Sequence, residues 1–177
     1  TDYIENWIKT KNKKCLLVQG PRQVGKTYLV EHFAANHYED FIEINFKEMP
    51  SAREIFTGDL TVDKMVMAIK FRFPEKKLLP KKTLIFLDEI QECEEAITSL
   101  KFWAIDNRFD VIASGSLLGI DYKRASSYPV GYVDYLKLYG LLLTIFQSSR
   151  HLKELSYHFL LKHSLSDVYG QIPANSA

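Results

Sequence analysis

The sequence predicts an α/β fold with a mostly parallel central sheet, and three observations carry that prediction. Short apolar runs alternate along the chain with stretches whose apolar residues recur at helical spacing. The apolar runs are nearly continuous, which is typical of strands covered on both faces. A glycine-containing loop joins the first apolar run directly to a helical stretch, as in a strand–loop–helix unit.

The elements of the first third follow from these patterns in chain order. Residues 3–9 carry apolar side chains at helical spacing and predict a helix, and the apolar run 15–18 predicts a buried strand. A second helix is expected over 28–35. The segment 41–46 alternates and is rich in β-favouring residues, so it predicts a strand, and a short helix is expected near Ser51.

The same patterns continue beyond residue 60. Asp63 is expected to cap a helix that runs to about Phe71. The unbroken apolar run 83–87 predicts a strand that ends in carboxylates. Residues 96–106 carry a helical apolar stripe, and 111–113 form another short strand, which ends in Ser-Gly-Ser.

Length and charge limit the classes of function. The chain has 177 residues, enough for one domain with a sizeable core, and its 23 basic and 22 acidic residues give a net charge of +1. This balance gives no argument for nucleic acid or an anionic membrane as a partner. The lysines of the segment 76–82 are read first as solvated loop charge, with nucleic-acid contact as the alternative.

Cysteine usage and hydropathy indicate a cytoplasmic protein. Cys15 and Cys93 lack partners at metal-ligand spacing, so neither a disulfide framework nor a zinc site is expected. The apolar run 141–146 is far shorter than the ~20 residues that span a bilayer. The N-terminus shows no signal-peptide pattern.

The most specific motif follows the first predicted strand. Residues 20–27 match G-x-x-x-x-G-K-[ST] at every fixed position, and a helix pattern follows. Glycines let the backbone N–H groups face phosphate oxygens, and the helix turns its positive end toward them. Lys26 would neutralise the β and γ phosphates and the Thr27 hydroxyl would bind Mg²⁺, so ATP and Mg²⁺ are the expected cofactors. The expected nucleotide ligands are Gly20, Pro21, Arg22, Gln23, Val24, Gly25, Lys26 and Thr27.

Two acidic residues, Asp88 and Glu89, directly follow the strand predicted over 83–87. Asp88 would hold Mg²⁺, because ligands of open α/β sheets bind at the carboxyl ends of strands. Glu89 would act as a general base on the water that attacks the γ phosphate. The alternatives are a turn-capping carboxylate for Asp88 and a surface acid for Glu89. Further along, Ser114 or Ser116 would touch the attacking water or the γ phosphate, or would make a local turn hydrogen bond, and we favour Ser114.

Four segments together resemble the prokaryotic ATPases of the AAA+ type, in the group whose ATPase domain precedes an uncharacterised C-terminal domain. The resemblance implies a P-loop NTPase three-layer sandwich with strand order 5-1-4-3-2, a Walker B glutamate at Glu89 and a sensor 1 residue at Ser114 or Ser116. It covers about residues 1–139. The segments are 20–27, 87–93, 113–119 and 128–131.

The chain departs from this family's pattern after Tyr139. The family usually continues with proline and an acidic, aromatic helix start, whereas this chain continues with the apolar run that begins at Gly140 and Leu141. Charged residues also become scarce there. We therefore expect an ATPase core over 1–139 and a divergent or truncated tail over 140–177, with no assignable arginine finger or sensor 2 arginine.

Three functions fit these residues. The first, which we favour, is an ATPase whose Mg²⁺-dependent hydrolysis drives a conformational or regulatory change, with Lys26, Glu89 and Ser114 as catalytic residues. The second is a nucleotide-binding module with little turnover, because a lid and C-terminal domain are missing. The third is a small-molecule kinase, against which the adjacent acids Asp88 and Glu89 argue, since phosphotransfer needs no water-activating acid. Besides ATP, the expected partners are further copies of the chain or a C-terminal effector domain.

Overall fold

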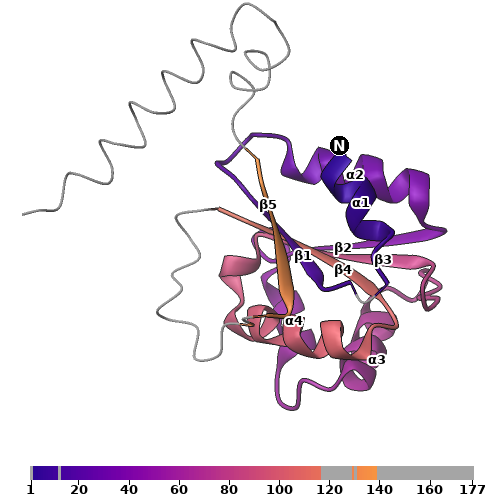
Figure 1. Cartoon of the computed structure of the whole chain (residues 1–177). Coiled ribbons are helices and arrows are strands. Elements are labelled where there is room, and N and C mark those ends of the chain that lie inside the picture. The colour runs from indigo at the N-terminus through magenta and orange to yellow at the C-terminus, as the bar shows by residue number, and fades with distance from the viewer. Residues whose placement is uncertain (1, 12, 117–128, 130, 139–177) are drawn as a thin grey trace, which may run out of the picture. The chain divides into compact units, whose positions relative to one another are not determined.

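Five parallel strands form the central sheet of the computed structural model, which describes residues 2–11, 13–116, 129 and 131–138. Their order across the sheet is β2-β3-β4-β1-β5, and every neighbouring pair is parallel (Figure 1). This confirms the predicted order 5-1-4-3-2. The strands are β1 (Cys15–Gln19), β2 (Asp40–Asn45), β3 (Thr83–Asp88), β4 (Asp110–Gly115) and β5 (Val133–Lys137).

Helices cover both faces of the sheet and complete three layers (Figure 1). α1 (Asp2–Ile8) and α2 (Lys26–His37) pack on one face, where their apolar residues form a cluster with alternate strand residues such as Leu16 and Val18. The other face is covered by η1 (Pro50–Phe56), α3 (Val62–Arg72), η2 (Ile90–Glu92) and α4 (Glu94–Asp106), over residues such as Cys15 and Leu17. This alternation along a buried strand is the two-residue period of β structure, and the three-layer α/β sandwich is confirmed.

Several element boundaries differ from those predicted. α3 begins at Val62 after an N-cap at Thr61, so Asp63 lies in the first turn and does not cap the helix. Its carboxylate instead pairs with Arg108 at 2.6 Å. β2 ends at Asn45, and Phe46 has turned into the core, where its ring packs against Phe56.

β5 is the strand that hydrophobic periodicity alone did not predict. It lies at the edge of the sheet beside β1, and only Val133 of its five residues is buried. An edge strand with mixed exposure lacks the continuous apolar run that marks the other strands. Only the family resemblance implied a fifth strand.

The described elements belong to one compact unit, Thr1–Leu138. The expected tail 140–177 and parts of the segments 113–119 and 128–131 lie outside the described residues. None of the described helices combines the length and the apolar character that crossing a membrane requires. Cys15 and Cys93 are both free and buried.

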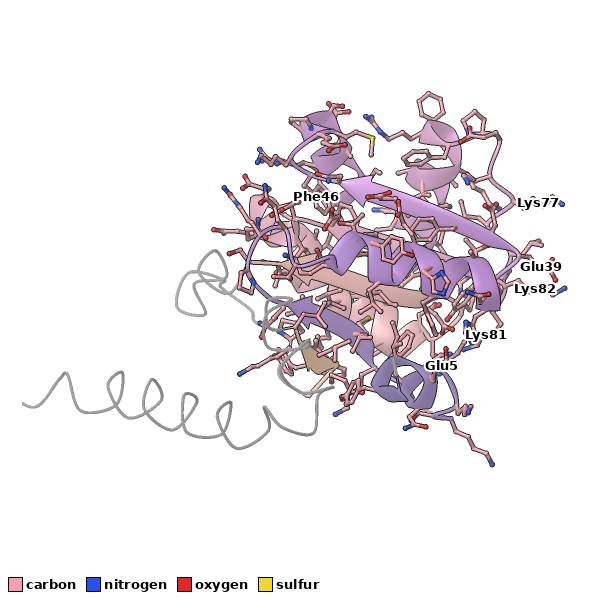
Figure 2. The ribbon with its side chains drawn as sticks, turned by 90° about the horizontal axis from the view of Figure 1, so that it is seen from above. Glu5, Glu39, Phe46, Lys77, Lys81 and Lys82 are labelled. Atoms are coloured by element: carbon pink, nitrogen blue, oxygen red, sulfur yellow. The ribbon has the colours of Figure 1, made fainter. Side chains whose placement is uncertain are left out.

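The lysines of the segment 76–82 lie at the end of the sheet where β2 begins. Figure 2 shows Lys77, Lys81 and Lys82 near Glu39 there, and Phe46 toward the opposite end. Acidic side chains pair with two of the lysines: Lys82 lies 2.7 Å from Glu39, and Lys76 lies 3.2 Å from Asp40. Much of this positive charge is therefore balanced locally.

Candidate functional site

Polar residues gather at the edge of the sheet where the parallel strands end. The loop 20–27 follows β1, Asp88 is the last residue of β3, and Ser114 belongs to β4. β4 lies between β1 and β3. Because the three strands are parallel, the two predicted motifs lie at the same edge of the sheet. This edge is where open α/β sheets bind their ligands.

The loop 20–27 wraps around the Lys26 side chain. Gln23 and Gly25 have positive φ angles of 63° and 85°, which curl the backbone before α2 begins at Lys26. The Lys26 ammonium donates to the carbonyl oxygens of Gly20, at 3.1 Å, and Pro21, at 2.9 Å. No side chain caps the start of α2, so its backbone N–H groups keep their positive end available for an anion.

Four donors hold the carboxylate of Asp88, which is 4% exposed. Oδ2 accepts from the Thr27 hydroxyl at 3.3 Å and from the Asn45 amide at 3.1 Å. Oδ1 accepts from the backbone N–H of Glu89 at 3.0 Å and from the Ser114 hydroxyl. Asp88 therefore enters the site in a fixed orientation.

Thr27 and Asp88 fit a magnesium ion. They present a hydroxyl and a carboxylate oxygen 3.3 Å apart at the sheet edge, and Mg²⁺ prefers one or two such protein oxygens together with phosphate oxygens and water. The described residues contain no cluster of three or more His, Cys, Asp or Glu side chains that would bind a metal without such help. The donor set thus matches an ion that arrives with a phosphate ligand.

Glu89 follows Asp88 on a left-handed residue, with φ 51°, between β3 and η2. Its carboxylate accepts a hydrogen bond from the Gln91 side-chain amide. The turn directs the two acids differently: Asp88 is held among the strand ends, whereas Glu89 is half-buried. Gln91 was not anticipated from the sequence, although its position two residues after a candidate base was the available signal.

A cavity of about 540 Å³ lies in front of these groups. This volume is within the range of small-molecule sites, roughly 300–1,000 Å³. Ser114 does not line the cavity, since it is fully buried behind Asp88. Gly20, Pro21 and Val24 are not among the lining residues either. The lining consists of Arg22, Gln23, Gly25, Lys26, Thr27, Lys47, Asp88 and Glu89.

Sequence reasoning missed two residues at the end of β2, its last residue Asn45 and Lys47 in the turn after it. Lys47 lines the cavity, and Asn45 contacts Asp88 from the neighbouring strand end. The available signal was the same one that pointed to Asp88: polar residues directly after an apolar strand of a parallel sheet. The prediction places Asn45 inside the strand 41–46 and Lys47 at the start of a loop, so neither residue stood out as the end of a strand.

This fold and this site define a P-loop NTPase-type α/β protein. A family model described as an AAA domain matches residues 12–146, which is most of the chain. The chain therefore belongs to this family of AAA+-type P-loop ATPases, and this membership supports ATP binding. No curated protein matches the chain.

The chain is also similar to several solved structures, all of them distant in sequence. A RuvB variant from Thermotoga maritima is 15% identical with a TM-score of 0.45, over 82% of this chain and 47% of that one. PCH-2 from C. elegans is 17% identical with a TM-score of 0.44, over 99% and 48%. The genome packaging NTPase B204 of Sulfolobus turreted icosahedral virus 2, solved with ATP-gammaS, is 16% identical with a TM-score of 0.35, over 60% and 67%. The chain thus spans about half the length of the first two proteins.

Proposed function

We propose that the chain binds ATP with Mg²⁺ in the cavity at the sheet edge and hydrolyses it to ADP and phosphate. The observation that carries this proposal is that Lys26, Thr27, Asp88 and Glu89 line one cavity although they come from two segments far apart in the sequence. Each of these residue types matches a separate requirement of phosphoryl transfer to water.

Binding rests on the loop 20–27. The N–H groups of the loop and of the start of α2 receive the phosphates, and the Lys26 ammonium moves from the carbonyls of Gly20 and Pro21 to phosphate oxygens. Thr27 and Asp88 hold Mg²⁺, which when bound offsets the charge of the phosphates.

Hydrolysis rests on Glu89. Its carboxylate accepts a proton from a water molecule whose oxygen bonds to the γ phosphorus, while the bond from that phosphorus to the β–γ bridging oxygen breaks and ADP leaves. Ser114 acts through Asp88, whose carboxylate it orients, and not on the phosphate. Hydrolysis is proposed to drive a conformational change that acts on a further copy of the chain or on a further domain.

A nucleotide-binding module with little turnover is the second proposal. The hydrogen bond from Gln91 to the Glu89 carboxylate favours it, because this contact occupies a carboxylate oxygen that would otherwise face the attacking water. In that case turnover requires Glu89 to leave Gln91. The two proposals place the nucleotide in the same site and differ in the expected rate of ATP turnover.

The test compares ATP binding and turnover of the chain with those of Lys26→Ala and Glu89→Gln. Lys26→Ala is expected to lose binding, and Glu89→Gln to keep binding and lose turnover. Glu94→Gln, an exposed acid at the start of α4, is the matched control. Unchanged turnover in both variants would refute the assignment of Lys26 and Glu89 to the site of hydrolysis. Bound ATP without turnover in the unmodified chain would favour the second proposal, and light scattering with and without ATP tests self-assembly.

A further inference from the structure

Lys47 adds a positive charge to the cavity from an element that belongs to neither motif. The cavity is lined by three cations, Arg22, Lys26 and Lys47, against the two anions Asp88 and Glu89. Lys47 comes from the turn after β2, and β2 lies beside β3 on the side away from the loop 20–27. Positive side chains thus approach the two acids from opposite sides.

The backbone of Lys47 is fixed relative to Asp88. Oδ1 of Asn45 accepts from the backbone N–H groups of Lys47, at 3.0 Å, and Glu48, at 3.1 Å, which closes an Asx turn. Nδ2 of the same side chain donates to Asp88 at 3.1 Å. The backbone N–H of Phe46 donates to the carbonyl oxygen of Asp88 at 3.1 Å, and its ring is fully buried. A long, exposed side chain therefore starts from a rigid base.

The Lys47 ammonium has no hydrogen bond or ion pair to the residues that the structure describes, 2–11, 13–116, 129 and 131–138. The Lys26 ammonium, in contrast, is bound by two carbonyls of its own loop. Lys76 and Lys82, at the start of β2, pair with acids. Lys47 is thus a cation in the cavity that is ready for an anionic ligand.

The order of the strands indicates which part of the ligand Lys47 meets. The loop after β1 and Asp88 at the end of β3 line the same cavity, so phosphates held by the loop would extend toward Asp88, and Lys47 lies one strand further on. We propose that Lys47 binds the terminal phosphate of a nucleoside triphosphate and so makes the cavity prefer a triphosphate to a diphosphate. This inference rests on the proposed nucleotide site, and it concerns a cation supplied by the same chain.

The experiment measures the dissociation constants of ADP and of a non-hydrolysable ATP analogue in the presence of Mg²⁺. Lys47→Ala is expected to weaken binding of the ATP analogue roughly tenfold, the effect of one hydrogen bond to a charged group, and to leave ADP binding within about twofold. Lys47→Arg retains the positive charge and is expected to keep the preference. Lys70→Ala, which removes an exposed lysine of α3 outside the cavity, is the control and is expected to change neither constant.

Each result decides the matter. A selective loss of affinity for the ATP analogue in Lys47→Ala supports the inference. Equal weakening of both nucleotides, or no change, overturns it while leaving the nucleotide site standing. Binding of neither nucleotide by the unmodified chain overturns the proposed function and this inference with it. Because Lys47 is exposed, its variants are expected to fold, and matching thermal unfolding curves check this.

Discussion

Asn45 and Asp88 are register partners at the ends of β2 and β3, and the Asn45 amide donates to the Asp88 carboxylate across 3.1 Å. The opposite side of Asp88 faces β4, whose Ser114 hydroxyl also donates to it. Both neighbouring strands therefore orient one carboxylate. Thr27, the partner of Asp88 in the proposed magnesium site, approaches from the start of α2.

Asn45→Ala is expected to lower the free energy of unfolding by about 1–3 kcal/mol. The change removes the acceptor of two backbone N–H groups and one of the donors to Asp88. Urea denaturation measures the loss. Asn36→Ala, which removes a single exposed hydrogen bond to the His32 carbonyl, is the control and should change stability by no more than about 0.5 kcal/mol. Equal effects of the two substitutions would contradict this role of Asn45.

Comparing Ser114→Ala with Ser116→Ala distinguishes between the two serines that the sequence offers for the same role in the site. Ser114→Ala removes a buried donor to Asp88, so we expect it to weaken Mg²⁺-dependent nucleotide binding and to lower stability by about 1 kcal/mol. Ser116→Ala should do neither, because Ser116 follows the end of β4. Titration of nucleotide binding with Mg²⁺ is the measurement. A larger effect of Ser116→Ala would reverse the assignment.

Gly20 and Gly25 are both required by the loop pattern, for different physical reasons. A Cβ on Gly20 would lie 2.6 Å from the carbonyl oxygen of Leu138, which follows β5 and donates its own N–H to Gln19 at 2.7 Å. A Cβ on Gly25 would meet nothing within 4 Å, but the residue has a φ of 85°. A glycine is thus required at position 20 by the close approach of two backbones, and at position 25 by the left-handed conformation of the residue.

Gly20→Ala is expected to cost about 1–3 kcal/mol of stability, because the backbone of the strand end must shift. Gly25→Ala should cost about 1 kcal/mol through left-handed strain alone. Thermal unfolding of both variants gives the comparison, and near-UV circular dichroism reports the packing. A Gly20→Ala variant as stable as the unmodified chain would show that residues 137 and 138 move aside freely.

Local patterns predicted four of the five strands and pointed to the candidate residues Lys26, Thr27 and Asp88, whereas the order of the strands came from the family resemblance alone. Lys26 and Thr27 belong to a loop whose glycines and flanks are contiguous, and Asp88 ends an apolar run. Asn45 and Lys47 could not be placed in the same way, because they belong to no motif and their role depends on the register of β2 against β3. The predicted order already places β2 beside β3, but the contact of Asn45 with Asp88 and the position of Lys47 at the cavity depend on side-chain geometry that no local pattern shows.

A buried ion pair lies at the other end of the strands, where β4 begins. Lys13 is 2.6 Å from Oδ2 of Asp110, the first residue of β4, and the Tyr38 hydroxyl donates to the same oxygen at 2.7 Å. Burial, together with the negative charge of Asp110, raises the pKa of Tyr38 above its ordinary value. Oδ1 of Asp110 is buried with no hydrogen-bond partner among the described residues, so the carboxylate depends on the contacts of its other oxygen.

Lys13→Met should therefore destabilise the fold by about 3–5 kcal/mol, because it leaves a buried carboxylate without its cation. Combining it with Asp110→Asn should restore part of the loss, since the uncompensated charge is then gone. Lys14→Met is the neighbouring control: its ion pair with Asp134 is longer, 3.8 Å, and more exposed, and is expected to contribute less than about 1 kcal/mol. Denaturant titration of the unmodified chain, Lys13→Met, Asp110→Asn and the double variant measures this coupling, and losses of the two single variants that simply add in the double variant would contradict it.

Glu43, on β2, has a carboxylate whose pKa is raised. Burial is the main cause, and the negative charges of Asp88, Glu31 and Glu48 add to it. The folded protein therefore holds the proton of Glu43 more tightly than the unfolded chain does. Above the folded pKa the ionised side chain reduces stability, and this cost disappears as the pH falls through the raised pKa toward the ordinary value of 4.5.

Glu43→Gln removes that charge at every pH, so the variant should unfold at a higher temperature than the unmodified chain at pH 7. Its advantage should shrink as the pH falls through the folded pKa and vanish below about pH 4, where Glu43 is protonated in both folded and unfolded chains. Thermal unfolding between pH 3.5 and 8 measures the difference, with Glu75→Gln in an exposed loop as the control. An advantage that persists unchanged at the lowest pH would mean that packing of the amide, and not loss of charge beside Asp88, stabilises the variant.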